Sequence, residues 1–203
     1  MSGDDVARVG RPPLTERRKA ATRLEVAREA VRLFTSKGVA GTSAEEVATA
    51  AGISVRTLWR YFPSKEACVW PLLAAGIQTL TRSLREWPPG RGIADAFEER
   101  AADETTADLP AVLALVRLTR TEPGLRAVWL QAHDDAESVI VAALARRSGL
   151  PEDDLGVKVR AALVNSALRA AVEHHALRPE ADEKDLVEAV HEALRIAAGG
   201  VPD

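Results

Sequence analysis

Cysteine and long apolar runs are both scarce in this 203-residue sequence, and each scarcity excludes certain kinds of protein. A lone cysteine, Cys68, rules out a disulfide framework within the chain and a cysteine-rich zinc site. The longest apolar stretches, such as 139–145, are far too short to cross a bilayer, and the first residues lack the apolar core of a signal peptide. These absences predict a soluble protein that stays in the reducing cytoplasm.

Signals for β-strands are missing as well. The sequence has no alternating β-branched runs and no hairpin dipeptide between two such runs, whereas nearly every periodic segment has helical spacing. We therefore predict an all-α fold of about nine helices. The expected helices span 15–37, 44–50, 55–62, a segment capped by Ser64, 93–103, 109–120, 125–147, 155–176 and 184–198, with Pro123-Gly124 as the separator before 125–147.

Charge is unevenly distributed along the chain. The formal net charge is −3, yet residues 1–66 carry 12 Lys and Arg against 8 Asp and Glu, while the remainder is acidic. This asymmetry is typical of a chain whose N-terminal part meets a polyanion, although a chance fluctuation of solvated charge gives the same counts. We predict three parts: a flexible basic arm over 1–14, a helix-turn-helix DNA-binding domain of three helices over 15–62, and a larger helical ligand-binding and dimerisation domain over 63–203.

The segment 43–62 has the helix, three-residue turn and helix of a helix-turn-helix motif. Ser43 stands three residues before Glu46, which is the spacing of a capping box at the start of a helix. Gly52 suits the turn, and Ser54 can cap the second helix. The apolar residues of both helices supply a small shared core, made of Val47, Ala51, Ile53, Leu58 and Phe62.

The second helix of this motif carries the residues that point to DNA. Four side chains share one of its faces and are the expected base contacts: Val55, Arg56, Trp59 and Arg60. Arginine pairs bidentately with guanine, and valine or an aromatic ring can rest on a thymine methyl group. Thr42, Ser43 and Lys65 stand at helix starts, and Thr57 and Tyr61 carry hydroxyls suited to phosphate oxygens, so these five residues are the expected phosphate contacts. The alternative is that the aromatic rings are ordinary core residues.

Residues 42–66, TSAEEVATAAGISVRTLWRYFPSKE, resemble the DNA-binding signature of the TetR (tetracycline-repressor) family of transcriptional regulators. The run 61–66, YFPSKE, is the most specific part, and the similarity extends over about residues 17–70. Many relatives have other residues where Arg56, Trp59 and Arg60 stand, which changes the base sequence that is read and not the class. The resemblance implies the DNA contacts just named, a palindromic operator in double-stranded DNA, and a bacterial cytoplasmic protein that joins the nucleoid when it binds.

The resemblance also implies a homodimer formed by the last two long helices. Two stripes of helical spacing are the expected interface: Val157, Ala161, Val164, Leu168 and Ala171 on the first helix, and Leu186, Val190 and Leu194 on the second. The alternative is that both stripes face the protein's own core. In the basic arm, Arg8 and Arg11 are expected to follow a narrow minor groove, unless the arm is a tail with incidental charge.

The middle helices are expected to surround a pocket for an unknown small-molecule effector. Its candidate lining residues are Trp70, Trp87, Phe97, Leu113, Val116, Arg117, Trp129 and His133, and plain core packing is the alternative for each aromatic ring. The C-terminal part has a faint similarity to family members that bind acyl-CoA-like molecules, which favours a small hydrophobic or acyl-type ligand. Binding of that ligand is expected to release a repressor from its operator.

Catalytic signatures are absent, because the sequence has no HExxH, no phosphate loop and no nucleophile elbow. The adjacent residues His174 and His175 point about 100° apart on a helix, so they cannot chelate one ion together. We therefore expect no metal, no cofactor and no enzymatic activity. An architectural or ligand-independent DNA-binding protein is the alternative to a regulator.

Overall fold

The computed structural model describes residues 14–88, 90–95, 97, 108–178 and 183–199. Its helices are α1 (Leu14–Lys37), α2 (Ala44–Ala50), α3 (Val55–Tyr61), the short 3-10 helix η1 (Glu66–Val69), α4 (Trp70–Arg85), α6 (Leu109–Leu118), α7 (Pro123–Ser148), α8 (Leu155–Ala176) and α9 (Glu183–Gly199). Within these ranges there is no strand, which confirms the all-α prediction of about nine helices. Residues 93–95 and 97 are helical, and the rest of the expected helix 93–103 lies mostly outside the described residues.

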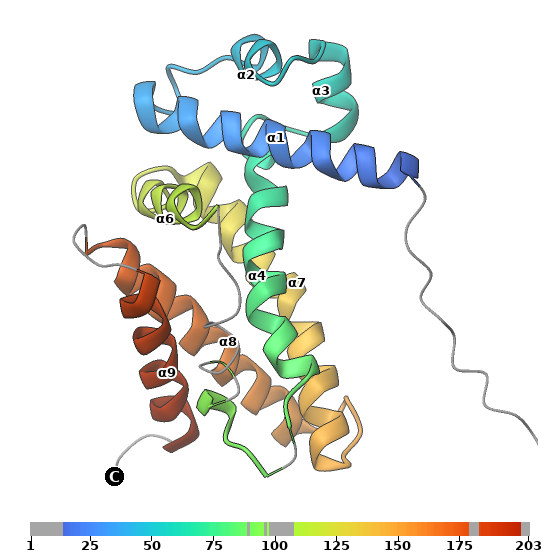
Figure 1. Ribbon diagram of the computed structural model, residues 1–203, viewed down its shortest axis with the longest axis vertical. Coiled ribbons are helices and arrows are strands. Elements are labelled where there is room, and N and C mark those ends of the chain that lie inside the picture. The colour runs from blue at the N-terminus through green and yellow to red at the C-terminus, as the bar shows by residue number, and fades with distance from the viewer. Residues whose placement is uncertain (1–13, 89, 96, 98–107, 179–182, 200–203) are drawn as a thin grey trace, which may run out of the picture.

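The helices form a head and a longer helical body (Figure 1). α1 lies across the top of the body, with α2 and α3 above it, and α4 runs down from the head beside α7. α8 packs against α6, α7 and α9, and the α8–α9 pair lies along the other side of the body. None of the described helices is both long enough and apolar enough to span a bilayer.

One apolar core joins the head to the upper part of the body. It includes Phe34 of α1, Val47 of α2 and Leu58 of α3, each fully buried, and it continues through Leu72 of α4 to Trp129 of α7. A second core fills the lower body between α7, α8 and α9. The first core therefore connects α7 with the head through continuous packing contacts.

Cys68 lies inside the first core and is fully buried. Burial raises the pKa of its thiol to about 12, and the nearby charge of Glu66 acts in the same direction. The thiol is therefore protonated and unreactive at neutral pH. Cys68 is therefore a packing residue of the first core.

Two helix boundaries differ from the sequence prediction. Pro123 and Gly124 form the first turn of α7 and do not separate it from α6. Proline is well suited to that position because the first helical N–H groups have no partner inside the helix. Ser64 does accept a hydrogen bond from the N–H of Ala67 at 3.1 Å, but the turn that it starts is 3-10, and the α-helix begins only at Trp70.

The predicted dimer stripes face the interior of their own chain, which favours the alternative stated from the sequence, and their role in a dimer stays a prediction. Seven of these side chains are at most 8% exposed and the eighth, Leu186, is partly buried: Val157, Ala161, Val164, Leu168, Ala171, Leu186, Val190 and Leu194. Most of them belong to the second core, where α8 packs against α9 and α7. Side chains that are already covered within one chain add almost no surface to a dimer.

Candidate DNA-binding surface

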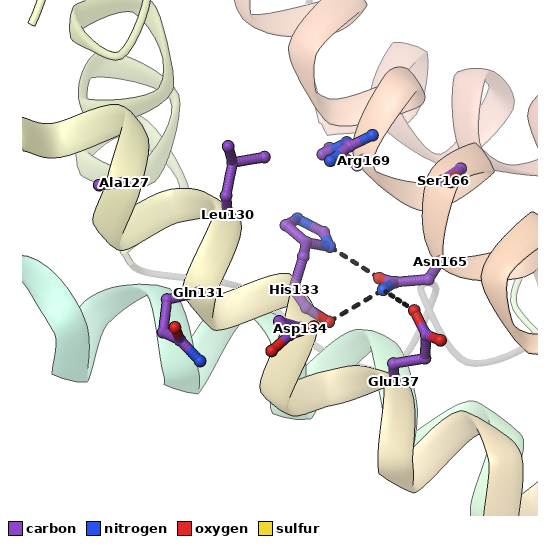
Figure 2. Close-up of a pocket in the computed structure, with 9 residues that line it drawn as sticks. All are labelled: Ala127, Leu130, Gln131, His133, Asp134, Glu137, Asn165, Ser166 and Arg169. Atoms are coloured by element: carbon purple, nitrogen blue, oxygen red, sulfur yellow. Dashed lines mark hydrogen bonds between the residues drawn. The ribbon is translucent and has the colours of Figure 1, made fainter. Parts of the chain in front are cut away.

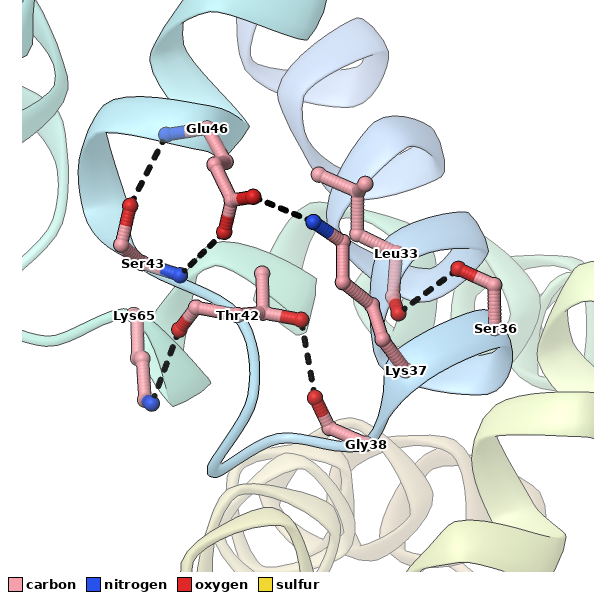
Figure 3. Close-up of polar contacts among 8 residues, drawn as sticks. All are labelled: Leu33, Ser36, Lys37, Gly38, Thr42, Ser43, Glu46 and Lys65. Atoms are coloured by element: carbon pink, nitrogen blue, oxygen red, sulfur yellow. Dashed lines mark hydrogen bonds and ion pairs between the residues drawn. The ribbon is translucent and has the colours of Figure 1, made fainter.

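α2 begins in a complete capping box. The hydroxyl of Ser43 accepts from the N–H of Glu46 at 3.2 Å, and the Glu46 carboxylate accepts from the N–H of Ser43 at 2.8 Å (Figure 3). Lys37, at the end of α1, pairs with the same carboxylate. The Lys37 ammonium and the Ser43 N–H together hold the pKa of Glu46 below its usual value. The box therefore fixes α2 to the end of α1.

The turn after α2 has the geometry of a Schellman motif. The N–H of Ile53 donates to the carbonyl of Ala48 at 2.9 Å, and that of Gly52 donates to Thr49 at 3.1 Å. Gly52 has a φ of +66°, a left-handed conformation that costs other residues energy. Glycine at this position therefore sets the direction in which the chain leaves α2 and enters α3.

α3 is held at its start and along its inner face. Ser54 caps it by accepting from the N–H of Thr57 at 3.2 Å. Leu58 is fully buried and Phe62 is 2% exposed, so both anchor the helix in the first core. The guanidinium of Arg23, from α1, lies over the Phe62 ring at 5.5 Å. These contacts confirm the predicted core of the helix-turn-helix motif.

The outer face of α3 carries the residues predicted to contact bases. Trp59 is 46% exposed, Arg56 and Arg60 are exposed, and Val55 is half-buried. Neither arginine forms an ion pair with any described residue. The guanidinium of Arg60 lies over the Tyr61 ring at 5.0 Å, which leaves its charge available to a ligand. Two cations without an ion pair to the described residues and an exposed indole, on a short helix capped at its start, match the chemistry of a major-groove reader.

The residues predicted to contact phosphate already have partners inside the head. Lys65 Nζ donates to the carbonyl of Val39 at 2.6 Å and to that of Thr42 at 3.0 Å, and so ties the loop before α2 to the start of η1. Figure 3 shows the contact with Thr42. The Thr42 side chain is 2% exposed and donates to the Gly38 carbonyl at 2.8 Å. Ser43 is exposed but serves as the cap of α2. These three residues therefore build the site, and their contact with phosphate stays a prediction.

Thr57 and Tyr61 complete the predicted phosphate set. The Thr57 hydroxyl is 2.9 Å from that of Ser54, and both Thr57 and Tyr61 are half-buried. Arg8 and Arg11 of the predicted arm lie outside the described residues.

Sequence reasoning missed the contribution of α1 to this surface. A groove of about 420 Å³ runs between the N-terminal half of α1 and the end of α3, lined by Lys19, Arg23, Arg60 and Tyr61 among others. Three of these residues carry positive charge, although Lys19 is paired with Glu16 at 2.7 Å. The dense basic residues of α1 were the signal that could have indicated this second edge.

The predicted effector-pocket residues lie in several environments. Val116 and Trp129 are buried in the first core, with Trp70 and Leu113 packed against it, while Phe97 and Trp87 belong to the second core. The Trp87 ring stacks on Arg147 at 3.9 Å. Arg117 donates to the carbonyl of Ala176 at 3.0 Å, and His133 faces a groove between α7 and α8. The structure therefore does not gather the eight residues around one described pocket.

A capped helix-turn-helix head with a cationic outer face, set on a helical body, defines a DNA-binding transcriptional regulator. Comparison with known families agrees. Residues 27–69 match the family described as bacterial regulatory proteins, tetR family, and residues 87–202 match the MftR C-terminal domain. The chain therefore belongs to the TetR family of transcriptional regulators, with a C-terminal domain of the MftR type. Members of this family regulate transcription and are not enzymes.

Individual relatives are similar over most of their length. The HTH-type transcriptional regulator TcmR of Streptomyces glaucescens is 28% identical over 193 residues, covering 90% of this chain and 85% of TcmR. The transcriptional regulator MftR of Mycobacterium tuberculosis is 28% identical over 188 residues, covering 91% and 93%. Among solved structures, the repressor FadR of Thermus thermophilus, in complex with lauroyl-CoA, matches with a TM-score of 0.55 and 24% identity over 89% of this chain and 95% of FadR. TetR regulators bind DNA and act as dimers.

Proposed function

We propose that this chain is a dimeric repressor that binds a palindromic operator through α3 of each protomer and leaves it when a small molecule binds the helical body. The observation that carries the proposal is the outer face of α3, where Arg56, Trp59 and Arg60 are presented by a helix that Ser54 caps at its start. Each bidentate arginine–guanine pair contributes about 1–3 kcal/mol of discrimination against the wrong base. Two such helices related by a two-fold axis read half-sites whose centres are about 34–36 Å apart, or a multiple of that distance.

A surface on α8 supports dimerisation. The side chains on its outward face are all exposed and mostly apolar or small, and we call them the outer stripe of α8: Leu155, Val159, Leu163, Ser166, Ala170, His174 and Leu177. Their spacing of four and three residues places them along one side of the helix. Exposed apolar rows of this length are typical of protein interfaces. The outer stripe is therefore the proposed dimer surface, in place of the buried stripes expected from the sequence.

The helical body is the proposed site of the effector. The repressor FadR from Thermus thermophilus holds lauroyl-CoA, which supports testing acyl-type ligands first. Release follows if the effector favours a spacing of the two α3 helices that does not fit the operator. Continuity of the first core from α7 to α3 supplies the mechanical link.

Binding to DNA at two salt concentrations tests the proposal. Fluorescence anisotropy with a duplex from the chain's own upstream region and with a scrambled duplex should show a preference of about 10³-fold or more that persists as salt rises. An architectural protein would bind both duplexes equally and lose affinity for both in parallel. Equal affinity for the two duplexes at either salt concentration contradicts the proposal.

A further inference from the structure

A polar groove of about 370 Å³ opens between α7 and α8, and Figure 2 shows its lining residues. Its floor holds His133 of α7 and Asn165 of α8, which are only 4% and 8% exposed. Leu130 and Arg169 line the same groove. A volume of this size fits a small ligand of roughly a dozen heavy atoms.

Hydrogen bonds in the floor fix the protonation of the imidazole. Asn165 Nδ2 donates to the carbonyl of His133 at 2.9 Å and lies 3.5 Å from a carboxylate oxygen of Glu137. The amide therefore turns its oxygen toward His133 Nδ1, at 2.8 Å. Nδ1 must donate to that oxygen, which leaves Nε2 as an unprotonated acceptor. Burial lowers the pKa of His133 and keeps this neutral form dominant at neutral pH.

Two polar groups of the groove lack a hydrogen bond to any described residue, although the charge of Arg169 acts on Glu173, one turn along α8. His133 Nε2 is buried and accepts no hydrogen bond. Arg169 forms no hydrogen bond and no ion pair within the described ranges, and it is half-exposed. Figure 2 shows the Nε2 edge of the imidazole turned toward the side where Leu130 and Arg169 lie. An unpaired buried acceptor is costly, so a donor supplied by a ligand relieves that cost.

We propose that this groove binds a small hydroxylated aromatic monocarboxylate. The hydroxyl donates to His133 Nε2, the carboxylate pairs with the Arg169 guanidinium, and the ring rests against the exposed side chain of Leu130. Asp134 and Glu137 also line the groove, and their charge disfavours a second carboxylate on the ligand. Because Nε2 is buried, a ligand reaches it only when neighbouring side chains shift, and Leu130 and Arg169, on that side in Figure 2, are exposed and half-exposed.

The groove adjoins both the core that reaches α3 and the proposed dimer surface. A ligand in the groove should therefore alter DNA binding, an expectation that rests on the proposed function. The imidazole of His133 meets the Trp129 ring edge-on at 4.3 Å, and Trp129 lies in the core that reaches α3. The Trp129 indole also donates to Glu173 of α8 at 2.7 Å. Ser166 lines the groove and belongs to the outer stripe of α8, so a ligand lies beside the proposed dimer surface.

Calorimetry on the purified full chain tests the site with three probes. 4-Hydroxybenzoate carries both groups, benzoate lacks the hydroxyl donor, and 4-hydroxybenzyl alcohol lacks the charge. We expect saturable binding of 4-hydroxybenzoate and binding of the other two that is weaker by about tenfold or more. Arg169→Gln should weaken 4-hydroxybenzoate by about tenfold, whereas Arg146→Gln, an exposed arginine farther along α7, should not. In ¹⁵N-histidine-labelled chain, the Nε2 resonance of His133 should move with 4-hydroxybenzoate and not with benzoate.

Several outcomes overturn the inference. They are no saturable binding up to millimolar 4-hydroxybenzoate, equal binding of benzoate, parent-like affinity in Arg169→Gln, or an unmoved His133 resonance. If lauroyl-CoA releases the chain from its operator and 4-hydroxybenzoate does not bind, the groove assignment fails and the proposed function stands. If the chain ignores its upstream DNA, the proposed function fails, while calorimetry on the free chain still decides whether the groove binds the probe.

Discussion

Removing the ammonium of Lys65 separates a structural role from a DNA contact. Lys65 Nζ donates to two backbone carbonyls, of Val39 and Thr42, at 2.6 and 3.0 Å. A hydrogen bond from a charged donor contributes about 1.5–3 kcal/mol, but the side chain is half-buried and water replaces part of what is lost. Lys65→Met keeps the aliphatic stem, and we expect it to lower the free energy of unfolding by about 1–2 kcal/mol. For a chain of this length the melting temperature should fall by about 2–8 °C.

The salt dependence of DNA affinity, measured on the same variant, tests the second possible role of Lys65. If Lys65 neutralised a phosphate, its loss would reduce the slope of log affinity against log salt by about one unit. Because two of its three N–H donors are already engaged by backbone carbonyls of the head, we expect the slope to be unchanged while stability falls. Lys158→Met, an exposed lysine on α8, is the matched control and should change neither quantity. Parent-like stability of Lys65→Met together with a reduced slope would refute this assignment of Lys65.

Three further changes test other parts of the structure. Gly52→Ala should lower the free energy of unfolding by about 1 kcal/mol in urea titration, because φ is +66°; an added Cβ meets no other atom within 4 Å, so backbone strain alone acts. Gly76→Ala, inside α4, is the control and should not lower the free energy of unfolding. Burial holds the pKa of His133 below its usual 6.5, so the unfolded chain binds a proton more readily than the folded chain. The contribution of His133 to the free energy of unfolding should be full above about pH 6.5 and should decline as pH falls. His133→Phe should remove that contribution to the acid-induced loss of stability. Leu163→Arg places a charge in the outer stripe of α8 and should shift sedimentation from dimer to monomer while the helical circular dichroism stays intact. An unchanged dimer would show that the outer stripe is not the dimer interface.

The head was predictable because its signals are local. Ser43 with Glu46, Gly52, and Ser54 each act on backbone atoms within a few residues, so sequence spacing alone placed α2 at its observed bounds and α3 within one residue of them. The outward position of Trp59 followed from the helical period once Leu58 was assigned to the core.

The body was less predictable because α8 is apolar on two faces. Val157 and Leu168 face the core while Val159 and Leu163 face outward, and a helical period cannot tell an inner row from an outer one. The pairing of His133 with Asn165 joins residues 32 positions apart, so no local pattern reveals it. Lysine can serve as a phosphate contact or as a carbonyl anchor, and the sequence could not reveal the anchoring contacts of Lys65, which join it to residues 26 and 23 positions away.

Selection of bound sequences from a random duplex library tests most directly whether α3 reads bases. The parent chain should select a palindrome, and Arg60→Ala should lose its preference at one base pair in each half-site, with affinity reduced by about 1–3 kcal/mol per half-site. Arg178→Ala, an exposed arginine on the body after α8, should select the same sequences as the parent. If Arg60→Ala and Arg56→Ala both select the same sequences as the parent, then α3 does not read the operator.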